Sequence, residues 1–183
     1  DSVTNVTIQN NVFIDELSAA IPASAVGFGC TGDAGTSRRN IKLLNNVFST
    51  RGKIGAIGGS RNIEVVGNRF TYSNLDEAEP YALRVTGSSD VAFRNNWFED
   101  KSKTTYPDST FQTTAVRINT TANFSMAGDT IVNAGSNGIL IAASAGATFS
   151  SLTIRGSGAN GVNVHSGAIV IEDSRIEESV MHG

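Results

Sequence analysis

The chain has 183 residues, of which 39% are hydrophobic and 17% are charged, and its formal net charge is −3. This composition is typical of one folded domain with a sizeable core, and the mild acidity argues against nucleic acid as a partner, because phosphate binding needs a basic surface. No apolar stretch approaches the ~20 residues of a membrane helix, which argues against membrane insertion. The single cysteine, Cys30, excludes an internal disulfide.

In chain order, the sequence returns several times to one nine-residue pattern. NVTIQNNVF begins at Asn5, NIKLLNNVF at Asn40, NIEVVGNRF at Asn62 and DVAFRNNWF at Asp90. The last apolar residue of each unit recurs at Phe13, Phe48, Phe70, Phe98, Ile131, Ile154 and Ile176. The unit is therefore about 22 residues long with insertions, and its three short runs of period-two alternation predict half-buried strands and no helix.

Three short strands in each turn of about 22 residues predict an all-β parallel β-helix of about six to seven coils. One polar position precedes the second strand of the first five units: Asn11, Asn46, Asn68, Asn96 and Asp129. We expect this residue to form a left-handed bend and its amide to bond to the neighbouring coils. The aromatic residue beyond it is expected to fill the core.

These repeats resemble the right-handed parallel β-helix of the pectate-lyase-like superfamily, which includes pectate lyases, alginate lyases and epimerases, and phage tailspikes. The resemblance implies a right-handed solenoid and places the Asn bend between the second and third strands of a coil. On that mapping the runs AVGF, AIGG, ALRV, AVRI, GILI and GVNV are first strands. No capping segment is visible at either end, so we expect residues 1–183 to be a single β-helix domain of a longer protein.

Insertions between the predicted strands occur before Asn123, and the later coils have none. IDELSAAIPAS follows Phe13, TYSNLDEAEPY follows Phe70, EDKSKTTYPDSTFQTT follows Phe98, and a fourth covers residues 29–39. All four are expected to flank the first-strand sheet. Long loops on a rigid scaffold commonly carry binding and catalysis, so this asymmetry predicts a cleft there, with ordinary loop variation as the alternative.

Two arginines are expected to lie side by side on the outward face of the first-strand sheet. The predicted outward row is Gly27, Gly58, Arg84, Arg117, Leu140 and Asn163, and Asn119 belongs to the next outward set. Like charges in register repel unless an anion lies between them, and a carboxylate fits the guanidinium fork. That carboxylate could come from the protein or from a uronic acid substrate; the protein candidates are Asp76, Glu77, Glu79, Glu99 and Asp100.

The same insertions supply the other candidates for a saccharide site. Tyr72, Tyr81 and Tyr106 could stack on sugar rings, although anchoring of its loop is the preferred interpretation of Tyr81 taken alone. Lys101 and Lys103 could bind the acidic groups. In a lyase, Arg84 and Arg117 would neutralise the uronate while an Arg, Tyr72, Tyr106, Lys101 or Lys103 removed the C5 proton. In a hydrolase, Asp76 or Glu79 would pair with Glu99 or Asp100.

The sequence therefore predicts an extracellular, cell-surface or virion protein that binds and cleaves an acidic polysaccharide, with elimination favoured over hydrolysis. No catalytic signature is complete, and the Asp-Pro-His-type motif of alginate epimerases is missing. The alternative is a non-catalytic glycan-binding or structural shaft of a tailspike or adhesin, as a monomer or a homotrimer. Calcium, bound by residues 76–79, is the one cofactor that the side chains suggest.

Overall fold

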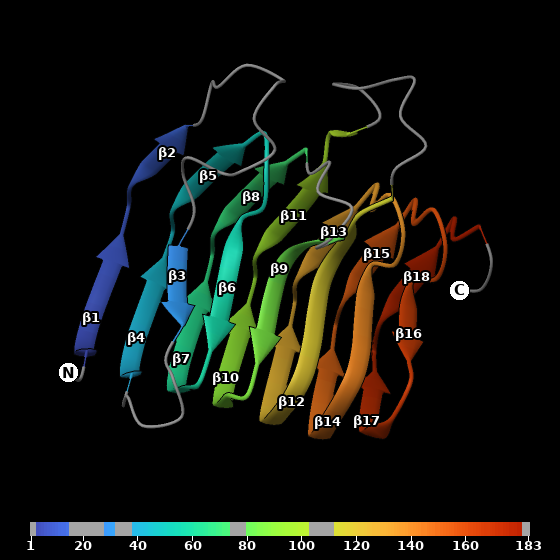
Figure 1. Ribbon diagram of the computed structural model, residues 1–183. Helices are drawn as coiled ribbons and strands as arrows, with labels where there is room; N and C mark the ends of the chain where they lie inside the picture. The colour runs from blue at the N-terminus through green and yellow to red at the C-terminus, as the bar shows by residue number, and fades with distance from the viewer. Residues whose placement is uncertain (1–2, 15–27, 32–37, 74–79, 103–111, 181–183) are drawn as a thin grey trace.

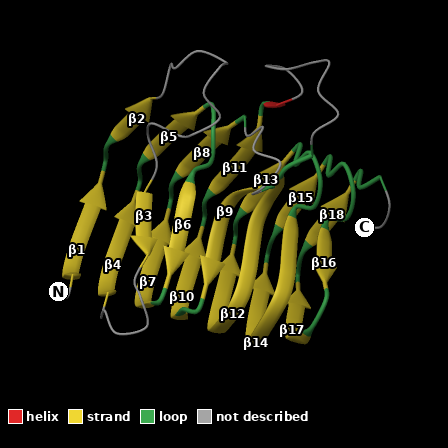
Figure 2. Cartoon of the chain, viewed as in Figure 1, coloured by secondary structure: helices red, strands yellow, loops and turns green. Residues whose placement is uncertain are grey.

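The computed structural model describes residues 3–14, 28–31, 38–73, 80–102 and 112–180. These residues form strands and short turns that wind repeatedly around one axis (Figures 1 and 2). The strands are β1 (Val3–Gln9), β2 (Val12–Ile14), β3 (Phe28–Thr31), β4 (Arg38–Leu44), β5 (Val47–Thr50), β6 (Gly55–Gly58), β7 (Ser60–Val66), β8 (Arg69–Tyr72), β9 (Tyr81–Thr86), β10 (Ser89–Arg94), β11 (Trp97–Asp100), β12 (Thr114–Ala127), β13 (Thr130–Val132), β14 (Ile139–Ser150), β15 (Thr153–Arg155), β16 (Val162–Val164), β17 (Gly167–Glu172) and β18 (Arg175–Glu177).

Each strand pairs in parallel with its counterparts in the adjacent coils. The third-strand sheet contains β2, β5, β8, β11, β13, β15 and β18. The first-strand sheet contains β3, β6, β9, β16 and the first halves of β12 and β14; the second-strand sheet contains β1, β4, β7, β10, β17 and the second halves of β12 and β14. In Figure 1 the arrows of β6 and β9 run opposite to those of β7 and β10, so the chain reverses between these two sheets. The predicted three-stranded parallel coil is confirmed.

The core is built from inward side chains that stack on their counterparts from coil to coil. Phe13, Phe48, Phe70 and Phe98 form a continuous ring stack with centroid separations of 4.7, 5.2 and 4.8 Å. Ile131 continues this row in the next coil. The aromatic position of the repeat therefore fills the core, as the sequence predicts, and offset ring stacking adds to the burial of apolar area.

A ladder of buried amides runs beside the aromatic stack. The backbone N–H and the side-chain Nδ2 of Asn46 both donate to Oδ1 of Asn68, at 2.9 and 3.0 Å. Asn68 donates in the same way to Asn96, and Asn11 to Asn46. Nδ2 of Asn46, Asn68 and Asn96 also donates to a carbonyl of the preceding coil, for example from Asn68 to Leu43 at 2.9 Å. The predicted amide bonds between coils are confirmed, and they satisfy polar groups that the core would otherwise leave unpaired.

The left-handed backbone at this bend belongs to the residue before each ladder position. Asn10, Asn45 and Asn95 have φ values of 57°, 53° and 54°, and Gly67 and Gly128 occupy the equivalent positions with φ of 66° and 68°. The expectation that the ladder residue itself is left-handed was therefore wrong. The bend takes two residues: the first supplies the unusual φ, which Asn and Gly tolerate, and the second points its amide inward.

Asp129 ends the amide ladder as an acceptor without a proton to donate. Its Oδ1 accepts both N–H groups of Asn96 at 2.8 Å, and its Oδ2 accepts the backbone N–H of Ala127 at 3.0 Å. Burial nevertheless raises the pKa of this carboxyl to about 6, because the three hydrogen bonds only partly replace the lost water. The next ladder position is Leu152, whose N–H donates to Ser174 instead.

A second column of polar residues lies at the corner between the first-strand and second-strand sheets, called here the first-to-second corner. Asn5, Asn40, Asn62, Asp90 and Asn123 all have positive φ, between 51° and 59°. Nδ2 of Asn62 donates to Asn40 and Nδ2 of Asn40 donates to Asn5, both at 2.8 Å. The Asn or Asp that opens each repeat is therefore an exposed left-handed corner residue, a role that the sequence analysis did not assign.

Candidate functional site

Arg84 and Arg117 lie directly beside each other on the outward face of the first-strand sheet. Arg84 of β9 is paired with Arg117 of β12, and the row continues to Leu140 and Asn163. In the other direction Arg84 pairs with Ala56, whereas the sequence predicted Gly58 in this row. That alignment was wrong by two residues, because a shift of two leaves the same side chains outward and period-two alternation cannot detect it.

Arg117 is oriented by a neutral partner. Its Nε donates to Oδ1 of Asn119 at 3.3 Å, two residues further along the same strand. Both side chains are half-buried. No carboxylate in the described part of the chain forms an ion pair with Arg117. The contact with Asn119 fixes one edge of the guanidinium group without neutralising its charge.

Tyr81 lies beneath two cations rather than presenting a surface to a sugar. Its ring is 3% exposed. The Cζ of Arg84 lies 5.2 Å and the Nζ of Lys53 lies 5.9 Å from the ring centroid. The prediction that Tyr81 stacks on a substrate was therefore wrong; its ring holds cations by cation–π attraction. Lys53 comes from the turn before β6, and no sequence signal pointed to it. We call Lys53, Arg84 and Arg117 the cationic patch.

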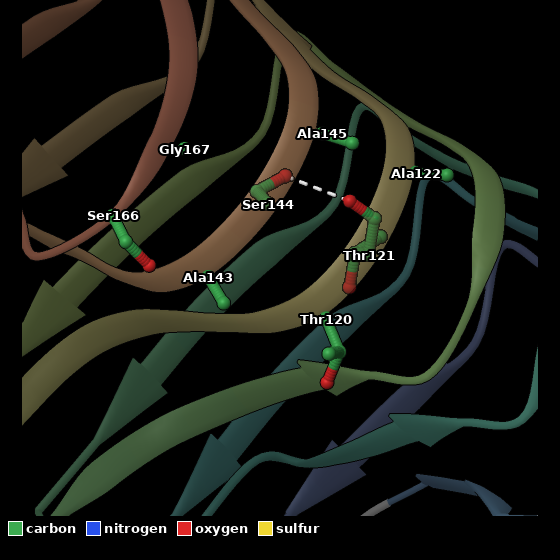
Figure 3. A pocket seen from close by; sticks show the side chains of 8 residues that line it. All are labelled: Thr120, Thr121, Ala122, Ala143, Ser144, Ala145, Ser166 and Gly167. Atoms are coloured by element: carbon green, nitrogen blue, oxygen red, sulfur yellow. Dashed lines mark hydrogen bonds between the residues drawn. The ribbon is translucent and has the colours of Figure 1, made fainter.

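A shallow depression of about 380 Å³ begins one residue beyond Asn119, at the first-to-second corner (Figure 3). Small side chains line it: Thr120, Thr121, Ala122, Ala143, Ser144, Ala145, Ser166 and Gly167. Ser144 Oγ donates to the carbonyl of Thr121 and Ser166 Oγ to that of Ala142, both at 2.8 Å. Thr120 has a φ of 46°, at a register irregularity between β12 and β14. A β-branched residue with such an angle is strained, and strain of this kind concentrates at functional sites.

The sequence analysis missed this depression, although a signal was present. TTA, ASA and SG recur at the same point of three successive units. Small side chains at the same corner of consecutive coils leave a depression that runs from coil to coil. An alignment of the repeats reveals this pattern.

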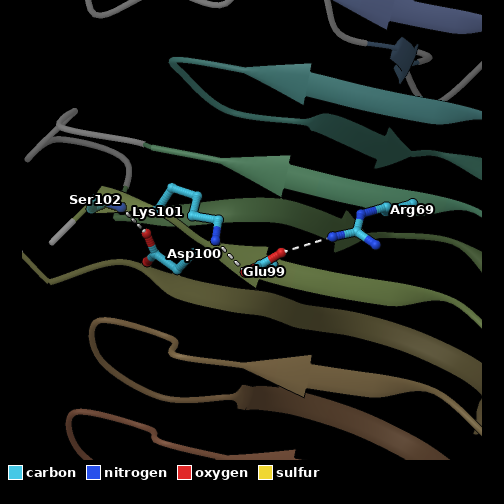
Figure 4. A network of polar contacts seen from close by, with 5 residues as sticks. All are labelled: Arg69, Glu99, Asp100, Lys101 and Ser102. Atoms are coloured by element: carbon cyan, nitrogen blue, oxygen red, sulfur yellow. Dashed lines mark hydrogen bonds and ion pairs between the residues drawn. The ribbon is translucent and has the colours of Figure 1, made fainter. Parts of the chain in front are cut away.

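Glu99 and Lys101 belong to the third-strand side of the coil, where Glu99 lies between Lys101 and Arg69 (Figure 4). Glu99 lies in β11 of the third-strand sheet, where it pairs with Arg69 at 3.1 Å and with Lys101. Burial would raise the pKa of Glu99, but Lys101, Trp97 and Arg69 hold it below its usual value. Arg69 also covers the ring of Trp97, with 5.6 Å from its Cζ to the centroid. Glu99 and Lys101 therefore neutralise charges on the third-strand sheet, contrary to the expectation that they line the arginine site.

Tyr72 and Asp100 point into the coil, which removes both from the predicted site. They are paired in neighbouring strands, and Tyr72 is fully buried while Asp100 is 5% exposed. Burial, assisted by the charge of Asp100, raises the pKa of the Tyr72 hydroxyl well above its usual value. Asp100 accepts the backbone N–H groups of Ser102 at 2.7 Å and Gly135 at 3.2 Å. The inward alternation of β8 and β11 continues for two residues beyond Phe70 and Phe98, so these side chains are structural.

The remaining predicted residues lie outside the described part of the chain: Asp76, Glu79, Lys103 and Tyr106. The calcium site predicted at residues 76–79 lies outside it as well. Among the described residues, no cluster of three or more His, Cys, Asp or Glu side chains could hold a metal ion. The described residues also contain no apolar helix of the length needed to cross a bilayer.

The repeat and its stacked coils match a known family over most of the chain. Residues 1–150 match the family described as the right handed beta helix region. The chain belongs to this right-handed β-helix family. Its handedness and architecture therefore agree with the fold predicted from the repeats. No curated protein sequence matches the chain.

A solved structure similar to this β-helix is that of the Streptococcus pneumoniae surface protein and adhesin PfbA. The TM-score is 0.60 at 14% sequence identity, and the match covers 98% of this chain and 49% of the other. The chain thus spans about half the length of that protein. At this identity the likeness concerns the fold alone.

Proposed function

We propose that this β-helix binds an acidic polysaccharide on its first-strand sheet, through the cationic patch and Asn119. The pairing of Arg84 with Arg117 carries the proposal. Backbones one strand spacing apart, about 4.8 Å, hold two positive groups side by side, and Arg117 is oriented by an amide instead of a carboxylate. A uronate or sulfate group would bind the guanidinium group of Arg117, because a guanidinium fork binds such oxyanions in a bidentate manner.

The depression beyond Asn119 gives this site a place for a neighbouring sugar. It opens at Thr120 and is lined by methyl and hydroxyl groups, and Ala143 is paired with Asn119 across the two strands. Hydroxyls already bonded to backbone carbonyls keep their remaining lone pairs for a ligand. A chain anchored by its acidic group at Arg117 would thus continue toward the corner.

Binding is better supported than cleavage. Elimination would need a base near the cationic patch, and two of the predicted bases are unsuited: Tyr72 is buried and Lys101 is held by Glu99. Hydrolysis would need two carboxylates there, but among the described candidates Glu99 lies on the third-strand sheet and Asp100 points into the coil. We therefore place the protein among extracellular surface proteins that hold glycans, in agreement with the fold of the pneumococcal adhesin, and within the pectate-lyase-like superfamily that its repeats resemble.

The test is calorimetric titration of the chain with oligogalacturonate, oligoalginate and neutral dextran. The acidic oligosaccharides should bind and dextran should not. Arg117→Gln should weaken binding roughly 10- to 100-fold, since a hydrogen bond to a charged group is worth about 1.5–3 kcal/mol. Arg155→Gln, which removes an exposed arginine from β15 on the third-strand sheet, is the matched control and should change binding by less than about twofold.

Absorbance of unsaturated uronates and release of reducing ends are followed in the same samples. A rise in both would establish elimination, and reducing ends alone would establish hydrolysis; binding without either is the expected result. The proposal is overturned if no acidic oligosaccharide binds, or if Arg117→Gln binds as tightly as the unchanged protein.

A further inference from the structure

A second pair of arginines lies at the first-to-second corner, away from the cationic patch. Arg39 of β4 is paired directly with Arg61 of β7, and both side chains are exposed. We propose that Arg39 and Arg61 form a second anion-binding site, which takes the sulfate or carboxylate groups of an acidic polysaccharide. Nothing in this proposal depends on Arg84 or Arg117.

The outward residues of these two strands separate into a neutralised pair and a like-charged pair. Lys42 of β4 pairs with Glu64 of β7 in register, with 3.2 Å between Nζ and Oε2. Three residues earlier on the same strands, arginine lies opposite arginine. No carboxylate in the described ranges forms an ion pair with Arg39 or Arg61. Like charges directly opposite are unfavourable by themselves, and an oxyanion bridging both guanidinium groups would remove that repulsion.

The backbone that carries these arginines is held on both sides. Each is followed by a left-handed residue of the corner column, and Nδ2 of Asn62 donates to Asn40 at 2.8 Å. Arg61 follows buried Ser60, whose Oγ donates to the carbonyl of Gly58 at 3.0 Å and whose N–H donates to Ser88 at 3.2 Å. Only the arginine side chains remain to be ordered on binding, which lowers its entropic cost.

The row of arginines does not continue into the next coil. Ser89 takes the position in register with Arg61, and Asp90 takes the position of Asn62. Asn123 donates to Asp90 at 2.9 Å. Hydrogen bonds from Asn123 and Ser89, with the charge of Arg61, lower the pKa of Asp90, so a negative charge borders the arginine pair. Asp90→Asn should therefore change anion binding in the opposite direction to the loss of the arginines. The substitution removes the negative charge and keeps a residue that tolerates the left-handed backbone angle.

The experiment measures binding of heparin-type sulfated oligosaccharide and of oligogalacturonate by biolayer interferometry. Arg39→Gln/Arg61→Gln should weaken binding at least tenfold. Arg94→Gln/Arg155→Gln changes the net charge equally by removing two exposed arginines that have no arginine in register, and should stay within about twofold. Asp90→Asn should tighten binding. In a protein that already carries Arg117→Gln, which weakens the cationic patch, Arg39→Gln/Arg61→Gln should still lower the remaining binding at least tenfold, which separates this site from the cationic patch.

Equal losses in the two double variants would overturn the proposal, since net charge alone would then explain binding. A duplex DNA arm with the same dependence on Arg39 and Arg61 and tighter binding than either oligosaccharide would also overturn it, in favour of nucleic acid. Unchanged thermal unfolding of each variant shows that the fold is kept. The ratio of sulfated to uronate binding identifies the oxyanion.

Discussion

Asp129 should make the stability of this β-helix depend on pH in an unusual direction. The carboxyl is 1% exposed and its pKa is raised by burial to about 6. The folded protein therefore holds the proton more tightly than the unfolded chain, where the ordinary value is 3.8. The contribution of Asp129 to stability is greatest below about pH 4, falls between about pH 4 and pH 6, and is constant above that range.

The size of the effect follows from the shift. A difference of about two pKa units, at ~1.36 kcal/mol per unit, lowers the free energy of unfolding by about 3 kcal/mol across this range. Asp129→Asn removes the titration. The Oδ1 of an asparagine at position 129 can still accept both N–H groups of Asn96. Its Nδ2 would donate to the carbonyl of Phe93, just as Nδ2 of Asn68 donates to Leu43 of the preceding coil. The loss of the bond from Ala127 costs about 1 kcal/mol, so the variant should be about 2 kcal/mol more stable above pH 7.

The assay is urea unfolding of both proteins at several pH values between about 4 and 8, followed by circular dichroism. Other acids titrate equally in both proteins, so the difference between the two curves isolates Asp129. That difference should grow by about 3 kcal/mol with rising pH. A difference that does not change with pH would refute the reasoning, because it would mean that three hydrogen bonds stabilise the charged carboxylate as well as water does.

Three further substitutions test the amide ladder, the exposed corner column and the aromatic stack by the same unfolding assay. Asn68→Ala should destabilise by roughly 3 kcal/mol, since it removes the acceptor of both the backbone N–H and the side-chain Nδ2 of Asn46, whereas Asn62→Gly at the exposed column should cost less than about 1 kcal/mol. Equal effects at both positions would contradict a special role for the buried ladder. Phe70→Ala should cost about 3–5 kcal/mol because its ring stacks on two neighbours; a loss below about 1 kcal/mol would show that the stack can collapse around the gap.

The fold could be predicted because its constraints repeat. Each coil needs an inward aromatic or aliphatic residue at one position and an amide at another, so Phe48 and Asn46 have counterparts that reveal the period. The left-handed residue escaped detection because it is part of the dipeptides NN and GN, in which only the second residue carries the ladder. The exposed corner column was equally visible as the first letter of each repeat, but its role depends on φ, which the sequence does not display.

The site was harder to predict for two physical reasons. The sequence predicts loops at Tyr72 and Asp100 because the insertions begin, by comparison with the shorter repeats, directly after Phe70 and Phe98. In the structure, however, Phe70-x-Tyr72 continues the strand alternation. Glu99 and Arg69 lie on neighbouring strands, and an insertion separates these strands in the sequence. Their contact therefore depends on how the two strands are aligned, which the sequence does not reveal. By contrast, Arg84 and Arg117 belong to runs of the same form, so their pairing could be read from the repeat.

The parallel ladders also determine how this protein responds to tension. Every described strand between the two ends of the stack bonds to the coils before and after it, and Figure 1 places β1 and β18 at opposite ends of the solenoid. A pull between the termini therefore acts along the inter-coil hydrogen bonds and loads them one coil after another, as in opening a zipper. Each coil that opens releases about 22 residues, or roughly 75 Å of contour length. We therefore expect a β-helix of this kind to lengthen in steps of one coil when it is pulled between its ends, and so to dissipate a sudden load.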